Sequence, residues 1–219
     1  MTRRLQAVAA AGLLAVLAAC GGGSSPSDHP SASPAPTYTS PPPQLPTQPV
    51  ALSTKPPPWF PPAVSQPTQS AAYVAAAGLP YAEEMLKVHY HAHLDIDING
   101  KAVAVPPYIG FVVKGNRAIG LAPLHTHKDD GIIHIENNVP ADFLLGQFFI
   151  EWGVRFTPTC LGPYCTDKTH ELAVFVNGKK YAGDPTRLVL KSHQEIAIEY
   201  GTTGRLPTPP ASYKFPSGY

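Results

Sequence analysis

Residues 88–98 read Val-His-Tyr-His-Ala-His-Leu-Asp-Ile-Asp-Ile and are followed by Asn99-Gly100. Apolar and polar side chains alternate along this stretch, which is typical of a β-strand with one buried and one polar face. Asn-Gly is a strong signal for a hairpin turn, so residues 101–105 are expected to return as the partner strand. The polar face of the strand carries a row of three histidines: His89, His91 and His93.

A second group of histidines lies in residues 121–136, where we expect two strands, 121–127 and 132–136, around a turn. Whether the turn has four residues or only two, the cross-strand register places His134 opposite His125 or His127. Both registers put the same four side chains on one face: His125, His127, His134 and Glu136. Opposed Cβ atoms are about 5 Å apart and metal–imidazole bonds about 2 Å long, so two such rings can bind one ion.

These two polar faces predict a metal site if they meet in the fold. Six imidazoles and one carboxylate would then converge, and three or four such ligands suffice for zinc or copper(II). The expected cofactor is therefore one transition metal ion, copper(II) or zinc. The candidate ligands are His89, His91, His93, His125, His127, His134 and Glu136. The remaining histidines, at positions 29, 170 and 193, are expected to be ordinary surface or hydrogen-bonded residues.

Two other functions compete with simple metal binding. A cupin-like metal-dependent enzyme also uses a His-x-His pair with a nearby carboxylate, although the spacing from His127 to His134 and Glu136 departs from the usual cupin arrangement. A metal-free interaction module of the cell envelope would use the imidazoles as a pH-sensitive face. The sequence has no Gly-x-Ser-x-Gly, phosphate-binding loop or His-Glu-x-x-His motif. It therefore favours metal binding, sequestration or delivery over catalysis.

The remaining sequence predicts an α+β domain. Residues 140–152 place leucine, phenylalanine and tryptophan at helical spacing, and the alanine-rich residues 70–77 favour a short helix. Asn177-Gly178 predicts another hairpin, and further strands are expected at residues 188–190 and 196–198. The expected fold is a mainly antiparallel β domain built from hairpins with one central helix, preceded by a disordered Pro-rich tether.

The N-terminal residues predict export. Two arginines near the start precede an apolar run at residues 5–17, too short to span a bilayer, and Leu-Ala-Ala-Cys follows at residues 17–20. This ending resembles the bacterial lipobox. We therefore expect a lipoprotein signal peptide at residues 1–19, lipidation of Cys20 by chains such as palmitate, and a lipid-anchored protein on the outer face of the cytoplasmic membrane.

The segment after the lipobox is rich in proline, serine, threonine and glutamine, and it has few aliphatic side chains. Such a segment buries too little apolar surface to offset the entropy lost on ordering. We therefore expect residues 20–69 to form a disordered tether that carries the lipidated cysteine. The globular, histidine-rich domain is then expected at residues 70–219.

Composition excludes several classes of protein. A formal net charge of +1 without a dense block of lysine and arginine argues against a nucleic-acid partner. Three cysteines are too few for a thiolate zinc ribbon or an iron–sulfur cluster. Cys160 and Cys165 flank a short loop in an exported chain, and we expect them to form a disulfide. The expected partners are the membrane, through the lipid anchor, and the metal ion.

Several segments resemble a family of uncharacterised bacterial exported proteins and lipoproteins. They are His-Ala-His-Leu-Asp-Ile (91–96) with Asn99-Gly100, Val105-Pro106 with Ile109-Gly110, Leu-His-Thr-His (124–127) with Gly-Ile-Ile-His-Ile-Glu (131–136), and Leu-Gly-Gln-Phe-Phe (145–149) with Trp152-Gly153. The resemblance extends from about residue 79 to the C-terminus. It implies that these segments belong to one module, and it implies no activity.

Overall fold

The computed structural model describes residue 45 and residues 50–83 and 85–219. Within them the main sheet has six strands, and the first alternating stretch supplies the longest, β1 (Val88–Ile98). β1 pairs in parallel with β11 (Glu195–Thr202) and antiparallel with β5 (Ile132–Asn137). The complete order is β10 (Lys179–Lys180), β9 (His170–Val176), β11, β1, β5 and β4 (Leu124–His125). The sheet is therefore mixed, and one of its pairs, β1 with β11, is parallel.

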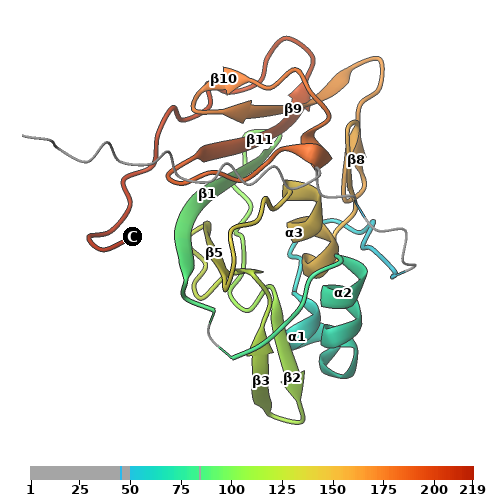
Figure 1. Ribbon diagram of the computed structural model, residues 1–219. Coiled ribbons are helices and arrows are strands. Elements are labelled where there is room, and N and C mark those ends of the chain that lie inside the picture. The colour runs from blue at the N-terminus through green and yellow to red at the C-terminus, as the bar shows by residue number, and fades with distance from the viewer. Residues whose placement is uncertain (1–44, 46–49, 84) are drawn as a thin grey trace, which may run out of the picture. The chain divides into compact units, whose positions relative to one another are not determined.

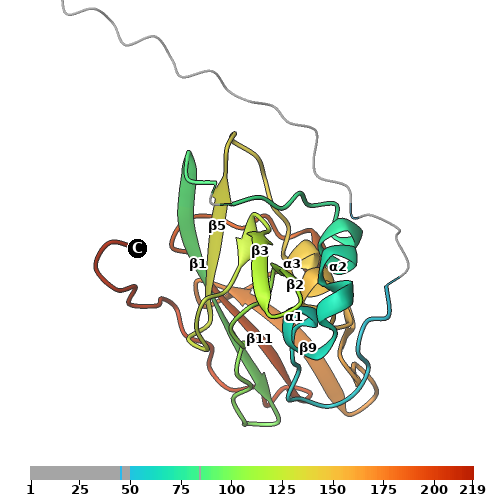
Figure 2. The same ribbon diagram turned by 90° about the horizontal axis from the view of Figure 1, so that it is seen from below.

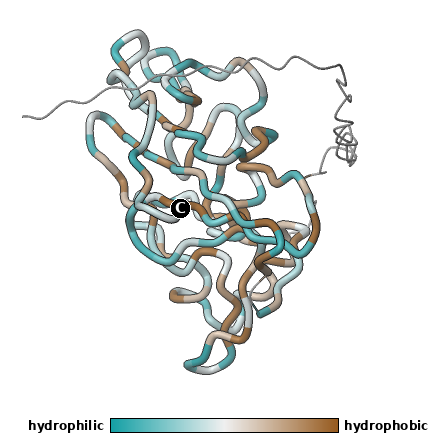
Figure 3. Tube along the Cα trace, turned by 60° about the vertical axis from the view of Figure 1, so that its left-hand side comes forward, coloured by the Kyte–Doolittle hydropathy of each residue, from teal (hydrophilic) through white to brown (hydrophobic). Residues whose placement is uncertain are grey.

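One face of this sheet is apolar, as the alternation in β1 predicts. Leu94 and Ile96 of β1 lie beside Ile196 and Ile198 of β11 and join one buried core. Helix α3 (Leu145–Trp152) adds Leu145, Phe148, Phe149 and Trp152 to that core. Helices α2 (Ser70–Ala76) and α3 lie on one side of the sheet, and the residues after β11 lie on the other (Figures 1 and 2). Hydrophobic and hydrophilic residues interleave along the chain (Figure 3).

The central helix α3 is confirmed, but it is shorter than the predicted residues 140–152. Its start is fixed by Gln147, whose side-chain oxygen accepts a hydrogen bond from the Leu144 backbone N–H at 2.9 Å. Its end is Gly153, whose φ of 77° stops the helix in the left-handed region that glycine adopts readily. The amide of Gln147 also donates to Ala77 at the end of α2, and this bond ties the two helices together.

Smaller elements surround the main sheet. A separate two-stranded sheet pairs β2 (Phe111–Lys114) with β3 (Arg117–Leu121). A three-stranded sheet contains β6 (Phe156–Thr157), β7 (Cys160–Leu161) and β8 (Tyr164–Cys165). Three short helical turns complete the described elements: α1 (Pro62–Ser65), η1 (Pro67–Gln69) and η2 (Pro185–Arg187).

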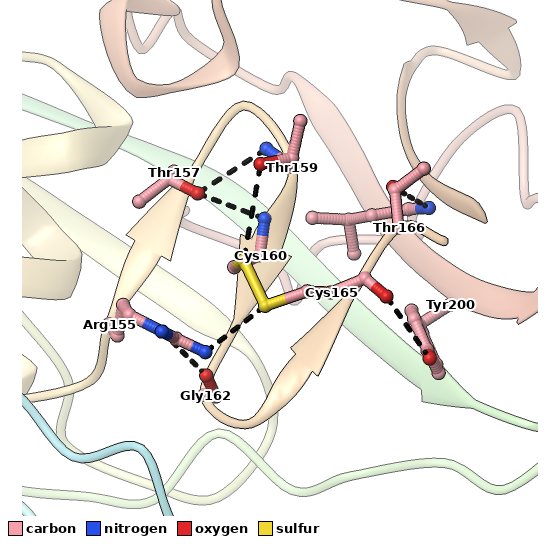
Figure 4. Close-up of a disulfide and its surroundings, with 9 residues drawn as sticks. Arg155, Thr157, Thr159, Cys160, Gly162, Cys165, Thr166 and Tyr200 are labelled. Carbon is pink, nitrogen blue, oxygen red and sulfur yellow. Dashed lines mark hydrogen bonds between the residues drawn. A yellow bond between two sulfur atoms is a disulfide. The ribbon is translucent and has the colours of Figure 1, made fainter. Parts of the chain in front are cut away.

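The predicted disulfide between Cys160 and Cys165 is present, and it joins opposed positions of β7 and β8 (Figure 4). Arg155 lies across this hairpin, where its Nε donates to the Gly162 carbonyl at 2.8 Å and its Nη2 to the Cys165 sulfur at 3.1 Å. The Tyr200 hydroxyl donates to the Cys165 carbonyl, so the hairpin is also linked to β11 of the main sheet.

The two Asn-Gly turns are confirmed, with both residues of each turn at positive φ as type I′ hairpins require. After Asn177-Gly178 the chain returns as β10, paired with β9. After Asn99-Gly100 it returns only through an isolated bridge between Asp97 and Ala102. The predicted strand at 101–105 is therefore not formed as a full strand, although the Val103 N–H donates to the Ile96 carbonyl at 2.8 Å. The predicted strand at 188–190 is likewise reduced to a bridge between Leu144 and Val189.

The boundary predicted at residue 70 needs a correction, because residues 50–69 pack on the domain. Trp59 is 5% exposed, its ring meets Trp152 edge-on at 5.8 Å, and its carbonyl accepts from the Trp152 indole at 3.0 Å. Ser53 exchanges backbone hydrogen bonds with Gly153 and Arg155. The prediction relied on the proline-rich composition of this segment. In the structure, the buried Trp59 and a bridge between Ser53 and Val154 hold the segment on the domain. The predicted signal peptide, Cys20 and nearly all of the tether up to residue 49 lie outside the described residues.

Candidate metal centre

Three strands bring the histidines into one row on the polar face of the sheet. His91 of β1 is paired with His134 of β5, and His134 is paired in turn with His125 of β4. Of the two registers that the sequence allows, the structure has the one with His134 opposite His125. The two predicted polar faces meet because β1 pairs directly with β5, which also places His89 opposite Glu136.

His125 is held in one tautomer by its own strand. Its Nδ1 lies 2.9 Å from the Ala122 backbone carbonyl, and a carbonyl only accepts, so Nδ1 carries the proton. The Nε2 atom therefore presents a lone pair. This atom is buried and has no hydrogen-bond partner, and it lies 3.7 Å from Glu136 Oε1. A backbone carbonyl that fixes the second nitrogen of an imidazole is the usual support of a metal-ligating histidine.

Gly110 explains how β4 reaches this position. A Cβ atom at Gly110 would collide with the Leu124 carbonyl and touch the His125 side chain, and the residue has a φ of 74°. Only glycine allows the backbone to approach β4 so closely. The His125 side chain, which is fully buried, is thus set by the packing of the 110 loop as well as by its own strand.

Four side chains form the largest ligand group among the described residues: His125, His127, His134 and Glu136. One nitrogen or oxygen from each lies within 4.8 Å of the others. His134 Nδ1 is 3.6 Å from Glu136 Oε1, and the His127 ring lies 4.6 Å from the His134 ring and 4.9 Å from the His125 ring. Three imidazoles and one carboxylate form a donor set of the kind that binds zinc or copper(II).

A second group shares His134 and adds His89 and His91. His91 Nε2 lies 3.1 Å from His89 Nε2 and 3.2 Å from His134 Nδ1. Ligand nitrogens around a tetrahedral ion with bonds of about 2.0 Å are about 3.3 Å apart. The two distances from His91 Nε2 are therefore close to those that one ion requires.

Electrostatics keep the donors in their ligating forms. Burial lowers the pKa of His91 to about 4 and that of His125 to about 4, so both imidazoles are neutral at neutral pH. Burial alone would raise the pKa of Glu136, but its interactions with His134, His125 and His89 outweigh this and lower it. Neutral imidazoles and an ionised carboxylate are the forms that bind a metal ion.

The structure places His93 apart from the other candidate ligands. Its Nε2 donates to the Asp130 carbonyl at 3.0 Å, and its Nδ1 lies 2.9 Å from Glu195 Oε2. Both ring nitrogens are therefore engaged. Although His93 forms a separate group with Asp95 and Glu195, its hydrogen bonds give it a structural role. Strand parity predicted the face of His93 correctly, but not its partners across the sheet.

The residues after β11 supply contacts that the sequence did not reveal. The Tyr213 ring stacks on His93 at 3.6 Å, and the Tyr219 ring lies 4.4 Å from the His91 ring. The Tyr219 carbonyl accepts from His193 Nε2 at 2.9 Å, so His193 holds this end of the chain. Their sequence lacks the periodicity of a helix or strand, and no local pattern relates these aromatic residues to a sheet face.

The other two histidines behave differently. His170 stacks on Tyr200 and lies 2.8 Å from the Thr169 hydroxyl, which agrees with an ordinary hydrogen-bonded residue. His29 lies outside the described residues. Among the described residues, no helix is long and apolar enough to cross a membrane.

Comparison with protein-family models, with curated proteins and with solved structures finds no match to this chain. The resemblance to the family of exported bacterial proteins therefore stays an expectation from the sequence, and the geometry of the histidine centre carries the functional argument.

Proposed function

We propose that this protein binds one transition metal ion, copper(II) or zinc, at His125, His127, His134 and Glu136, for metal binding, sequestration or delivery. The observation that carries the proposal is His125 Nε2, a buried nitrogen with a lone pair and no partner. A buried polar atom without a partner costs about 1–3 kcal/mol, and coordination would remove that cost. His89 and His91 flank the ion and support it from the second group that shares His134.

The chemistry of the donors supports these two metals. Imidazole and carboxylate suit zinc and copper(II), and copper(II) binds such donors more strongly than zinc does. The chain has only two methionines, and the two cysteines of the domain are joined in a disulfide. Sulfur ligation, which copper(I) prefers, therefore has no support at this centre.

We further propose that the protein is exported and anchored by a lipid on Cys20 at the outer face of the bacterial cytoplasmic membrane. The support is the signal-like sequence of residues 1–20. Export also agrees with the disulfide between Cys160 and Cys165, which an oxidising compartment preserves. A Cys20→Ser variant should leave the membrane fraction; if it stays there in the same amount as the unmodified protein, the anchor is not at Cys20.

Elemental analysis of the exported protein, purified without a histidine tag and without chelator, tests the metal proposal. We expect about one equivalent of copper or zinc, which His134→Gln should abolish because both ligand groups contain His134. His170→Gln is the matched control, since its ring lies on β9 against Tyr200. Metal-free protein that also takes up neither ion at micromolar concentration would remove the proposal.

A further inference from the structure

A cavity of about 750 Å³ opens beside the proposed metal ion. Tyr108, Phe111, Ile119 and Leu121 supply apolar walls, while His127 and Arg117 also line it. Its volume lies within the range of about 300–1,000 Å³ that is usual for small-molecule sites. His127 thus belongs both to the ligand group and to the wall of this cavity.

Hydrogen bonds join the segment of Tyr108 and Phe111, which lines the cavity, to the segment that carries His125 and His127. Thr126, between His125 and His127, donates its backbone N–H to the Ile109 carbonyl at 3.2 Å and accepts at its carbonyl from Tyr108 N–H at 2.8 Å. The Thr126 hydroxyl also accepts from Ile109 N–H at 3.1 Å. These bonds hold the cavity wall at a fixed position relative to the metal ligands.

Aromatic side chains form the boundary between the cavity and the ion. The Phe111 ring meets His127 edge-on at 5.6 Å and His125 at 6.2 Å. Tyr108 meets Phe111 at 5.3 Å, is 48% exposed, and adopts a φ of 71°, which is rare for a tyrosine. Such a conformation persists only where surrounding contacts hold it, and here the Tyr108 N–H is held by Thr126.

Charge decides what the cavity would accept. Arg117 forms no salt bridge with any described residue, and Glu83 is the acidic residue of the lining. A divalent ion held by neutral imidazoles and one carboxylate keeps a net charge of about +1. Arg117 adds a positive charge that offsets the negative charge of Glu83, so the electrostatic potential in the cavity stays positive and favours an anion. The apolar walls in turn favour an apolar body on that anion.

We propose that the cavity binds a small organic carboxylate with an aromatic or aliphatic body, whose carboxylate group coordinates the metal ion beside His127. The body packs against Tyr108, Phe111 and Ile119, and Arg117 adds to the attraction. The proposal rests on the proposed metal site, because the ion supplies the anchoring charge.

Calorimetric titration of the zinc-loaded protein with 3-phenylpropionate tests this inference, after the zinc content has been measured. Acetate and 3-phenylpropanamide are the matched probes, one without the apolar body and one without the charge. We expect 3-phenylpropionate to bind at least tenfold more tightly than either. In the cobalt(II)-substituted protein, it should also change the visible absorption bands, which report on ligands bound to the ion.

Two variant pairs locate the binding in the cavity. Ile119→Asn should weaken 3-phenylpropionate binding at least fivefold, and Val139→Asn should not, although Val139 is also an exposed apolar residue. Arg117→Gln should weaken it and Arg187→Gln should not, since Arg187 lies in η2. Metal content should stay the same in all four variants.

The outcomes separate this proposal from the metal proposal. Protein that binds no metal overturns both. Zinc-loaded protein that binds the three probes equally, or whose affinity is unaffected by Ile119→Asn, overturns only the carboxylate site and leaves the metal centre standing.

Discussion

His125 donates its Nδ1 proton to the backbone carbonyl of Ala122, three residues earlier in the chain, at 2.9 Å. This single bond decides which nitrogen of the most buried imidazole points at Glu136 and His134. The bond is local, so His125 is preorganised by its own segment, whereas the remaining ligands come from another strand and a loop. Preorganisation of one ligand reduces the ordering cost of binding the ion.

Replacing His125 with alanine should weaken copper or zinc binding at least about 100-fold. Mutation of residues that only hydrogen-bond to a metal ligand typically lowers metal affinity about 10–100-fold, and loss of a ligand itself should lower it at least as much. His170→Ala should leave the affinity unchanged, since His170 contacts Asp167 and Thr169 far along the chain from the ligands. Competition titration against a chelator of known affinity measures both. Equal losses in the two variants would refute the assigned ligand set.

His93 should behave as a structural residue. His93→Gln should leave metal stoichiometry unchanged but lower the free energy of unfolding by about 3 kcal/mol, because it leaves Glu195 buried without its partner. Urea denaturation with parallel metal analysis separates the two effects. Burial raises the pKa of Glu195, so the double variant with Glu195→Gln should recover part of the lost stability. Loss of metal in His93→Gln without a change in stability would place His93 among the ligands instead.

Local patterns predicted the parts of this fold that depend on neighbouring residues. Alternation along β1 predicted its two faces, and turn parity limited the residue opposite His134 to His125 or His127, of which the structure has His125. The pairing of β1 with β5 and β11 joins segments far apart in the sequence, and no residue in β1 specifies those partners. The sequence therefore predicted a shared site only on the condition that the two histidine groups meet. The structure shows that they meet, because β1 pairs with β5.

The stability of the metal-free protein should depend on pH through His91. Its pKa is about 4 in the folded state and 6.5 in the unfolded chain, so unfolding takes up a proton between these values. The contribution of His91 to stability is therefore complete above pH 6.5 and is lost as the pH falls towards 4. His91→Gln should flatten the slope of unfolding free energy against pH by up to about 1.4 kcal/mol per unit. Identical slopes in both proteins would contradict this prediction.

Glu199 should change stability with pH in the direction opposite to that of His91, lowering it as the pH rises. Burial, with Asp97 and Asp95 nearby, raises its pKa to about 7 from 4.5, so the folded protein retains a proton that the unfolded chain releases. The charged carboxylate destabilises the fold above pH 7, and this cost disappears below pH 4.5. Glu199→Gln should therefore raise the unfolding free energy by about 1–2 kcal/mol at pH 8 and change it little at pH 4.5. Glu171→Gln, on the adjacent strand, should show no such gain, because Glu171 accepts from Gly204 and Lys180.

The segment before residue 70 is where sequence reasoning failed most clearly, and Trp59 tests the correction. Trp59 is 5% exposed, packs on Trp152, and donates its indole N–H to the Lys55 carbonyl at 2.7 Å. Trp59→Ala should lower the unfolding free energy by about 3–5 kcal/mol, as removal of a buried aromatic ring usually does. The neighbouring Phe60 is 59% exposed, so Phe60→Ala should cost less than about 0.5 kcal/mol. Urea denaturation of the two variants measures the difference; a tether would give equally small effects for both, whereas a packed segment gives a large effect only for Trp59.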